Sequence, residues 1–160
     1  MIRPRLTAAL ALVLLLAGCM SEPDPLKEPL VARLFLEAGM GEPGMRVQLP
    51  QSQNVVVINP HPVFTEIDIA DADLVRTDGG WCLQLRFTPA AARDLQRLTA
   101  TRMGRQLLLA FNDQAAGLRR IDRIEAAGTL LIFVEVDDVN LPPLVARLKR
   151  TAASHGAAAR

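Results

Sequence analysis

Apolar and polar positions alternate along several short segments of this chain, a pattern typical of half-buried strands. It is clearest at Trp81–Phe87, where every second side chain is a large apolar one. The turn residues Asp78, Gly79 and Gly80 join this segment to an apolar run at Ile69–Thr77, which predicts a β-hairpin. Other strands are predicted at residues 45–49, 55–58, 106–111, 118–124 and 129–136.

Helical spacing occurs in three places. Apolar residues recur between Leu30 and Ala38 at intervals that predict a short amphipathic helix. Thr88 and Pro89 form a hydroxyl cap followed by a proline at the first helical position, so a second helix is expected from there to about Arg102. A third is expected after residues 137–140, up to residue 152, with one apolar face: Leu141, Leu144, Val145 and Leu148.

Two further features set the limits of these elements. Pro60 and Pro62 are expected to prevent regular structure around His61. The last residues, 153–160, are rich in alanine and contain little that could be buried, so a disordered tail is predicted there. The pattern as a whole predicts one α+β domain over residues 28–152, with a small mixed, mainly antiparallel sheet and two or three helices packed on one face.

The N-terminus shows a different pattern. Arg3 and Arg5 precede an apolar run from Leu6 to Leu16, and small residues lead to Gly18 and Cys19. The run is shorter than the roughly 20 residues that span a bilayer, so it is typical of a signal peptide. Residues 20–27 are polar and contain prolines, as expected of a tether.

The segment ending in Cys19 resembles the lipobox of bacterial lipoproteins. The resemblance implies that residues 1–18 are a signal peptide cleaved between Gly18 and Cys19. It also implies that Cys19 carries a diacylglyceryl group and an acyl chain such as palmitate, so that residues 19–27 form a lipidated tether. Met20 stands where an aspartate would favour the inner membrane in enterobacterial lipoproteins, which implies a periplasm-facing anchor in the cell outer membrane.

A second resemblance covers residues 62–128. Pro62 to Thr65, the glycine hairpin, and Thr99 followed five residues later by Gly104 and a basic residue occur in an order that resembles the periplasmic head of the SecD protein-export membrane protein. The resemblance implies a module that contacts a protein or polypeptide. The turn at residues 112–114 departs from the family pattern, and the transmembrane helices of the exporter have no counterpart in residues 28–152.

Composition argues against several other classes of function. A net charge of +1 gives no electrostatic reason to bind nucleic acid. The only histidines, His61 and His155, are far apart in sequence, and no cluster of cysteine and histidine suggests a metal. With Cys19 lipidated, Cys82 is left without a partner and is expected to be a small buried side chain. We therefore expect no metal and no small-molecule cofactor.

The sequence predicts a non-enzymatic, membrane-anchored envelope lipoprotein that binds a protein partner or polypeptide in the periplasm, with an accessory role in export or envelope assembly. Strand addition at an exposed edge near Val55–Ile58 is one way to bind it. Two alternatives remain open at this stage, as does the oligomeric state. One is a purely structural lipoprotein, and the other is an envelope hydrolase that uses the carboxylates of Glu66, Asp68, Asp71 and Asp73.

Overall fold

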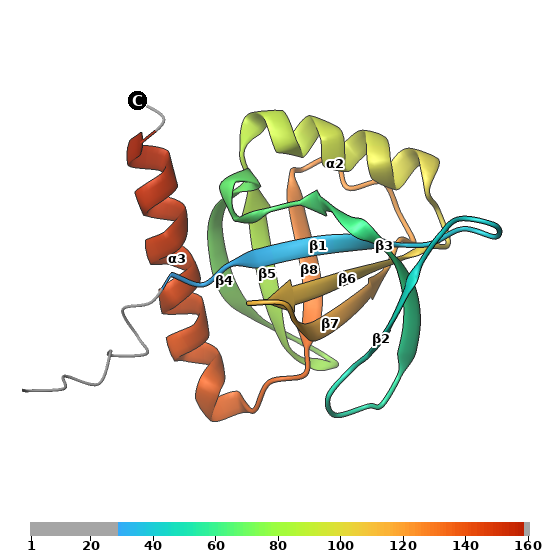
Figure 1. Ribbon diagram of the computed structural model, residues 1–160. Coiled ribbons are helices and arrows are strands. Elements are labelled where there is room, and N and C mark those ends of the chain that lie inside the picture. The colour runs from blue at the N-terminus through green and yellow to red at the C-terminus, as the bar shows by residue number, and fades with distance from the viewer. Residues whose placement is uncertain (1–28, 159–160) are drawn as a thin grey trace, which may run out of the picture.

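A computed structural model describes residues 29–158 of the chain (Figure 1). The expected signal peptide, Gly18, the lipidation site Cys19 and the tether lie outside the described residues. Within the described part, no helix is both long and apolar enough to cross a membrane.

The described chain is built on one sheet of eight strands in the order β2-β3-β1-β6-β7-β8-β5-β4. Every neighbouring pair in that order is antiparallel. The sheet and two α-helices confirm the predicted α+β class. The strands are β1 (Ala32–Glu37), β2 (Met45–Gln48), β3 (Val55–Phe64), β4 (Ile69–Thr77), β5 (Gly80–Phe87), β6 (Gln106–Phe111), β7 (Gln114–Arg120) and β8 (Thr129–Val134).

The two helices, α2 (Pro89–Thr101) and α3 (Leu141–Ala158), contribute to the same main core. Leu95 of α2 and Leu148 of α3 are buried there with Leu34 of β1 and Leu85 of β5. In Figure 1, α2 crosses one end of the curled sheet, and α3 runs beside β4. Short 3-10 turns precede β4 and α3, at η2 (Glu66–Asp68) and η3 (Asp138–Asn140).

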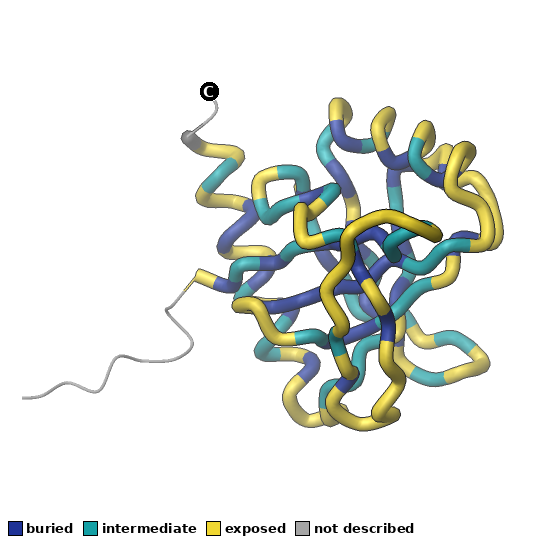
Figure 2. Tube along the Cα trace, turned by 45° about the vertical axis from the view of Figure 1, so that its right-hand side comes forward, coloured by how far each residue is buried: buried dark blue, intermediate teal, exposed yellow. Residues whose placement is uncertain are grey.

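A second, smaller core lies on the opposite face of the sheet. Phe35 of β1 and Leu108 of β6 are covered there by Val56 and Ile58 of β3 and by Leu49, just after β2. The β2–β3 hairpin therefore folds back over the sheet, and its outer surface is mostly exposed (Figure 2).

The prediction of a helix over residues 30–38 was wrong, because this segment contains strand β1. Ala32, Leu34 and Leu36 belong to the main core, and Phe35 belongs to the smaller core on the other face. A strand buried on both faces loses the period-two pattern, and periodicity alone does not separate it from a buried helix.

The prediction that Pro60 and Pro62 prevent regular structure was also wrong, because both lie within β3. Phe35 of β1 pairs with Pro62 of β3, and Glu37 pairs with Ile58. One residue of β1 thus lies opposite three residues of β3, and the extra residues form a bulge. Prolines are tolerated at bulges because no ladder hydrogen bond is required of them there. The bulge separates the half of β3 that pairs with β2 from the half that ends in the main core.

Two boundaries also differ from those expected. The turn after β6 is short because Asn112 and Asp113 both adopt positive φ, so β7 begins at Gln114 rather than near Leu118. Helix α3 continues to Ala158, so the predicted disordered tail was wrong for residues 153–158. Thr151 and Ala152 are still buried, and the small residues that follow extend the helix beyond its packed part.

Candidate functional site

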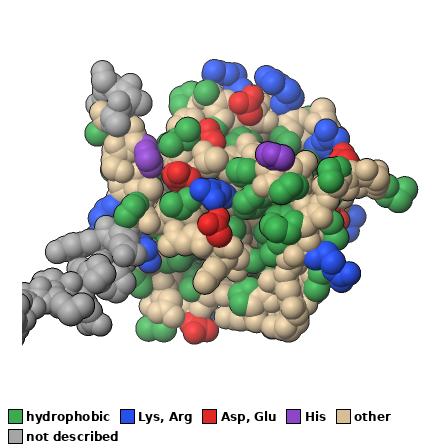
Figure 3. Space-filling model, viewed as in Figure 1, with side chains coloured by type: hydrophobic (Ala, Val, Ile, Leu, Met, Phe, Trp, Pro, Cys, Tyr) green, Lys and Arg blue, Asp and Glu red, His purple; other side chains and the backbone are tan. Residues whose placement is uncertain are grey.

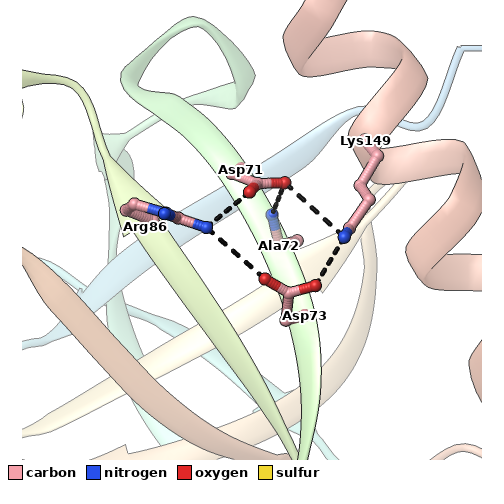
Figure 4. A network of polar contacts seen from close by, with 5 residues as sticks. All are labelled: Asp71, Ala72, Asp73, Arg86 and Lys149. Carbon is pink, nitrogen blue, oxygen red and sulfur yellow. Dashed lines mark hydrogen bonds and ion pairs between the residues drawn. The ribbon is translucent and has the colours of Figure 1, made fainter.

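The carboxylates proposed for hydrolysis include two that form an ion-pair network on β4 (Figure 4). A terminal nitrogen of Arg86 lies 2.5 Å from Asp71 Oδ2 and 3.4 Å from Asp73 Oδ2. Lys149 of α3 places its Nζ 2.5 Å from Asp73 Oδ1 and 3.9 Å from Asp71 Oδ1. Two carboxylates thus face two cations, and the network links α3 to β4 and β5.

This network favours the ionised carboxylate. The hydrogen bond from Lys149, together with the charges of Lys149 and Arg86, lowers the pKa of Asp73 below its ordinary value despite some burial. The same hydrogen bond raises the pKa of Lys149. A carboxyl general acid needs the opposite shift, so Asp73 is not suited to that role in a hydrolase.

The other two acidic residues of that region lie around η2. Asp68 Oδ2 accepts hydrogen bonds from the Thr65 backbone N–H, at 2.8 Å, and from the Thr65 hydroxyl, at 3.2 Å, which is the arrangement of a capping box. One carboxylate oxygen of Glu66 is enclosed and has no hydrogen-bond partner among the described residues. Asp68 thus fixes the turn into β4 and is not available as the partner of Glu66 in acid–base chemistry.

The two outer strands of the sheet differ in how they are covered. Strand β4, at one end of the sheet, lies beside α3. Lys149 of this helix contacts Asp71 and Asp73 of β4 (Figures 1 and 4). Strand β2, at the other end, pairs with β3 alone in the sheet order. The expected edge at Val55–Ile58 was therefore misplaced by one strand, because these residues lie in β3 and pair with β2.

Backbone pairing shows which groups of β2 point outward. The Val57 carbonyl accepts a hydrogen bond from Ala38 N at 2.8 Å, so it points away from β2. Val57 lies opposite Arg46, and in an antiparallel ladder such a pair turns the backbone groups of both residues away from each other. The N–H and C=O of Arg46 therefore point to the open edge, and those of Gln48 follow two residues later.

Large apolar side chains surround this edge. In Figure 3, hydrophobic side chains gather on the face formed by β2, β3 and the loop before β2. Met40 is fully exposed, and about half of the surface of Met45 and of Val55 is accessible, as is 41% of that of Val57. An open backbone edge beside apolar side chains has the geometry that accepts an added strand.

A pocket of about 340 Å³ lies next to the hairpin, between the bulge of β3 and the C-terminal end of α2. Its apolar lining includes Leu36, Val63 and Leu98. Its polar lining combines one carboxylate, one amide and three basic side chains: Glu42, Asn59, His61, Arg102 and Arg105.

Arg105 and Glu42 neutralise each other in this pocket. A terminal nitrogen of Arg105 lies 3.3 Å from Glu42 Oε2 and 3.4 Å from the Glu37 carbonyl oxygen. The hydrogen bond from Gly39 N, followed by that from Arg105, lowers the pKa of Glu42. The end of the Arg105 side chain lies where a Cβ on residue 39 would be, so a larger residue there would displace this guanidinium.

Several other predicted residues prove to be structural. Cys82 is a free, buried cysteine whose sulfur lies 3.8 Å from the Thr77 hydroxyl. Gly104 has a φ of +86° just after α2 and ends the helix as expected. The Asp137 side chain makes no helix-cap hydrogen bond, and instead accepts one from the Gln51 side chain at 3.3 Å. Residues 29–158 contain no group of three or more His, Cys, Asp or Glu that could hold a metal.

Comparison with protein-family models gives no match, and comparison with curated proteins gives none either. Solved structures do match. A structure of SecDF, described as a membrane component that enhances protein export, aligns over 92% of this chain and 71% of that chain, with 17% identity and a TM-score of 0.59. SecDF in a super-membrane-facing form aligns over 74% of this chain and 18% of its own, with 17% identity and a TM-score of 0.58.

A third match is SecDF from Thermus thermophilus, described as a translocon-associated membrane protein. It aligns over 79% of this chain and 20% of its own, with 18% identity and a TM-score of 0.51. At these identities the comparisons establish a SecD-like fold, and two of the three matches show this chain spanning about a fifth of the matched chain. The likeness extends well beyond residues 62–128, on which the sequence resemblance rests.

Proposed function

We propose that this protein is a non-enzymatic envelope lipoprotein that binds an extended polypeptide in the periplasm by strand addition to β2. The observation that carries the proposal is the open edge of β2, where the backbone of Arg46 and Gln48 points outward beside exposed apolar side chains. The SecD-like fold supports an accessory role in protein export or envelope assembly, because the matched SecDF is described as enhancing protein export.

The polypeptide must be extended to use this edge. Strand addition satisfies backbone groups of both chains and depends little on the sequence of the partner, while flanking apolar side chains favour apolar residues at alternate positions. Val55 and Val57 provide such a surface on the outer face of the hairpin, and Met45 adds an exposed apolar side chain on the other face. Export and assembly factors meet unfolded segments of many sequences, and a backbone-directed site suits that task.

Binding is tested with an N-acetylated peptide in which leucine and serine alternate, labelled for fluorescence anisotropy. Arg46→Pro removes the outward N–H and leaves the pairing between β2 and β3 intact, because that N–H does not face β3. We expect this variant to bind at least about fivefold more weakly, since one backbone hydrogen bond contributes about 1 kcal/mol.

Arg46→Ala is the matched control because it removes the same side chain and keeps the N–H. We expect its affinity to stay within about twofold of the wild type. Equal weakening in both variants would assign the effect to the side chain and contradict strand addition. No binding by the wild-type protein would favour the purely structural alternative.

We propose further that the domain is anchored through Cys19, with residues 1–18 removed, and that it faces the periplasm from the outer membrane. Support comes from the lipobox resemblance and from Met20. Two or three acyl chains anchor a protein stably, whereas one chain binds reversibly. Cell fractionation of wild type and Cys19→Ala tests the anchor. We expect the variant to leave the membrane fraction, and an unchanged density profile would refute the lipid anchor.

A further inference from the structure

We propose that the pocket between the β3 bulge and α2 binds the C-terminal residue of a polypeptide, with its carboxylate at Arg102 and its apolar side chain against Leu98. This proposal rests on the proposed function, because it names which part of a bound polypeptide the domain recognises in addition to the extended backbone.

The charges that line the pocket favour an anionic ligand. Arg105 is occupied by Glu42 and by the Glu37 carbonyl, so these two side chains leave no net charge in the pocket. Within residues 29–158, the Arg102 guanidinium forms no hydrogen bond or ion pair, although its charge helps to lower the pKa of Glu42. Two guanidinium groups thus share one carboxylate, and the excess positive charge favours an anion, for which the planar donors of arginine suit a carboxylate.

His61 lines the same pocket from the bulge of β3. Its Nδ1 lies 3.3 Å from Asn59 Oδ1, and the same oxygen accepts the His61 backbone N–H at 2.9 Å. These contacts hold the residue on the bulge and leave the other ring nitrogen without a partner among the described residues. The bulge of β3 therefore presents His61 to the pocket.

The apolar lining of the pocket favours a ligand that also carries an apolar group. Leu36, Val63 and Leu98 surround the same space as the cations, so a purely hydrophilic anion would leave apolar surface uncovered. A volume of about 340 Å³ is at the small end for ligand pockets. The last residue of a chain that ends in leucine or another apolar side chain combines a carboxylate and an apolar group within that size.

The position of the pocket fits the edge site. Glu42 lines this pocket and also a neighbouring hollow formed by Val55, Val57 and Met40. The two hollows therefore adjoin on the apolar side of the hairpin.

Arg102 also has a structural explanation, because a cation near the C-terminal end of a helix is favourable. That role alone predicts a change in stability on substitution and no preference for a carboxylate. The test therefore compares an acid with its amide, which differ in charge and share the apolar side chain.

The experiment titrates N-acetyl-L-leucine and N-acetyl-L-leucine amide into the protein, followed by NMR chemical shifts. We expect the acid to shift resonances of His61, Leu98 and Val63, with an affinity at least about fivefold higher than that of the amide. Arg102→Ala is expected to abolish the difference. Arg93→Ala, which removes an exposed arginine from the same helix, is expected to preserve it.

N-acetyl-Glu-Leu-amide tests whether the pocket binds an internal glutamate beside leucine rather than a C-terminus, because it offers a side-chain carboxylate and no C-terminal one. Weaker binding than N-acetyl-L-leucine supports the C-terminus, and tighter binding contradicts it. Equal affinity for N-acetyl-L-leucine and its amide, or chemical-shift changes outside the pocket, overturns the pocket proposal. This holds whether or not the alternating leucine–serine peptide binds at β2. Loss of alternating-peptide binding with retained acid preference would refute strand addition alone.

Discussion

At the scale of single residues, Thr99 shows how one buried hydroxyl joins two elements. Its side chain is 1% exposed, donates to the Leu95 carbonyl at 2.8 Å, and accepts the Glu125 backbone N–H at 3.0 Å. The hydroxyl thereby ties α2 to the segment that leads into β8. The SecD resemblance includes this threonine, and its role in the structure is to hold the fold together.

Thr99→Val is therefore expected to lower the free energy of unfolding by about 1–3 kcal/mol, because it leaves the Glu125 N–H buried without an acceptor. Urea denaturation measures the loss. Thr101→Val is the matched control, since Thr101 makes similar hydrogen bonds to its own helix on the exposed side. A loss of equal size in both variants would contradict a special role for Thr99.

Glu135 provides a second contact that depends on one charge. Its Oε2 accepts the backbone N–H groups of Gln51 at 2.7 Å and Ser52 at 3.0 Å, which holds the tip of the β2–β3 hairpin against the end of β8. Burial favours a higher pKa for Glu135, but the hydrogen bonds from Ser52 and Gln51 outweigh it and lower the pKa below 4.5. The contact is thus strongest when the carboxylate is ionised.

Because the folded-state pKa of Glu135 is lowered, its stabilisation is fully present above pH 4.5 and is lost as the pH falls through that lower value. We expect hydrogen-exchange protection factors at Gln51 and Ser52 to decrease over that interval. Glu135→Gln should show low protection at every pH, whereas Asp138→Asn, at an exposed position nearby, should follow the wild type. A pH-independent wild type would contradict this role.

At the scale of elements, the pairing between β7 and β8 is the shortest in the sheet. Only two residue pairs form it, Gly117 with Val134 and Leu118 with Phe133. A Cβ on residue 117 would lie 2.2 Å from the Phe133 carbonyl oxygen, so the two strands approach too closely for any side chain there. Glycine is required at this point because of backbone contact rather than a special φ angle.

Gly117→Ala is expected to destabilise the domain by about 1–3 kcal/mol, because the alanine methyl group would push β7 away from β8. Gly156→Ala in α3 is the control, since its Cβ would meet open space. That variant should be neutral or more stable by up to about 1 kcal/mol in urea denaturation. Similar destabilisation in the two variants would contradict the close approach at β7 and β8.

The elements also show what the sequence could predict. The β4–β5 hairpin and α2 follow from local signals, because the turn glycines and the Thr88 cap act within a few residues. Strand β1 could not be recognised, since its burial on two faces arises only when the β2–β3 hairpin folds over it. The open edge was placed one strand away, because strand order is set by pairing between distant segments.

At the scale of the whole molecule, the chemistry of the site depends on contacts that no local pattern reveals. The pocket brings together His61, Arg102 and Glu42 from three separate segments. Conversely, Asp71 and Asp73 formed a prominent acidic cluster in the sequence, and the fold pairs them with Arg86 and Lys149. Exposed charge clusters of this kind are more often held by counter-ions of the same fold than used in catalysis.

The proposed function requires that β2 accepts an extended polypeptide through its outward backbone groups. Amide hydrogen exchange, resolved by residue with and without the alternating leucine–serine peptide, tests it most directly. Strand addition at β2 predicts slower exchange at Arg46 and Gln48, with little change along β4. Unchanged exchange at those two amides with saturating peptide, or new protection along β4 instead, would contradict it.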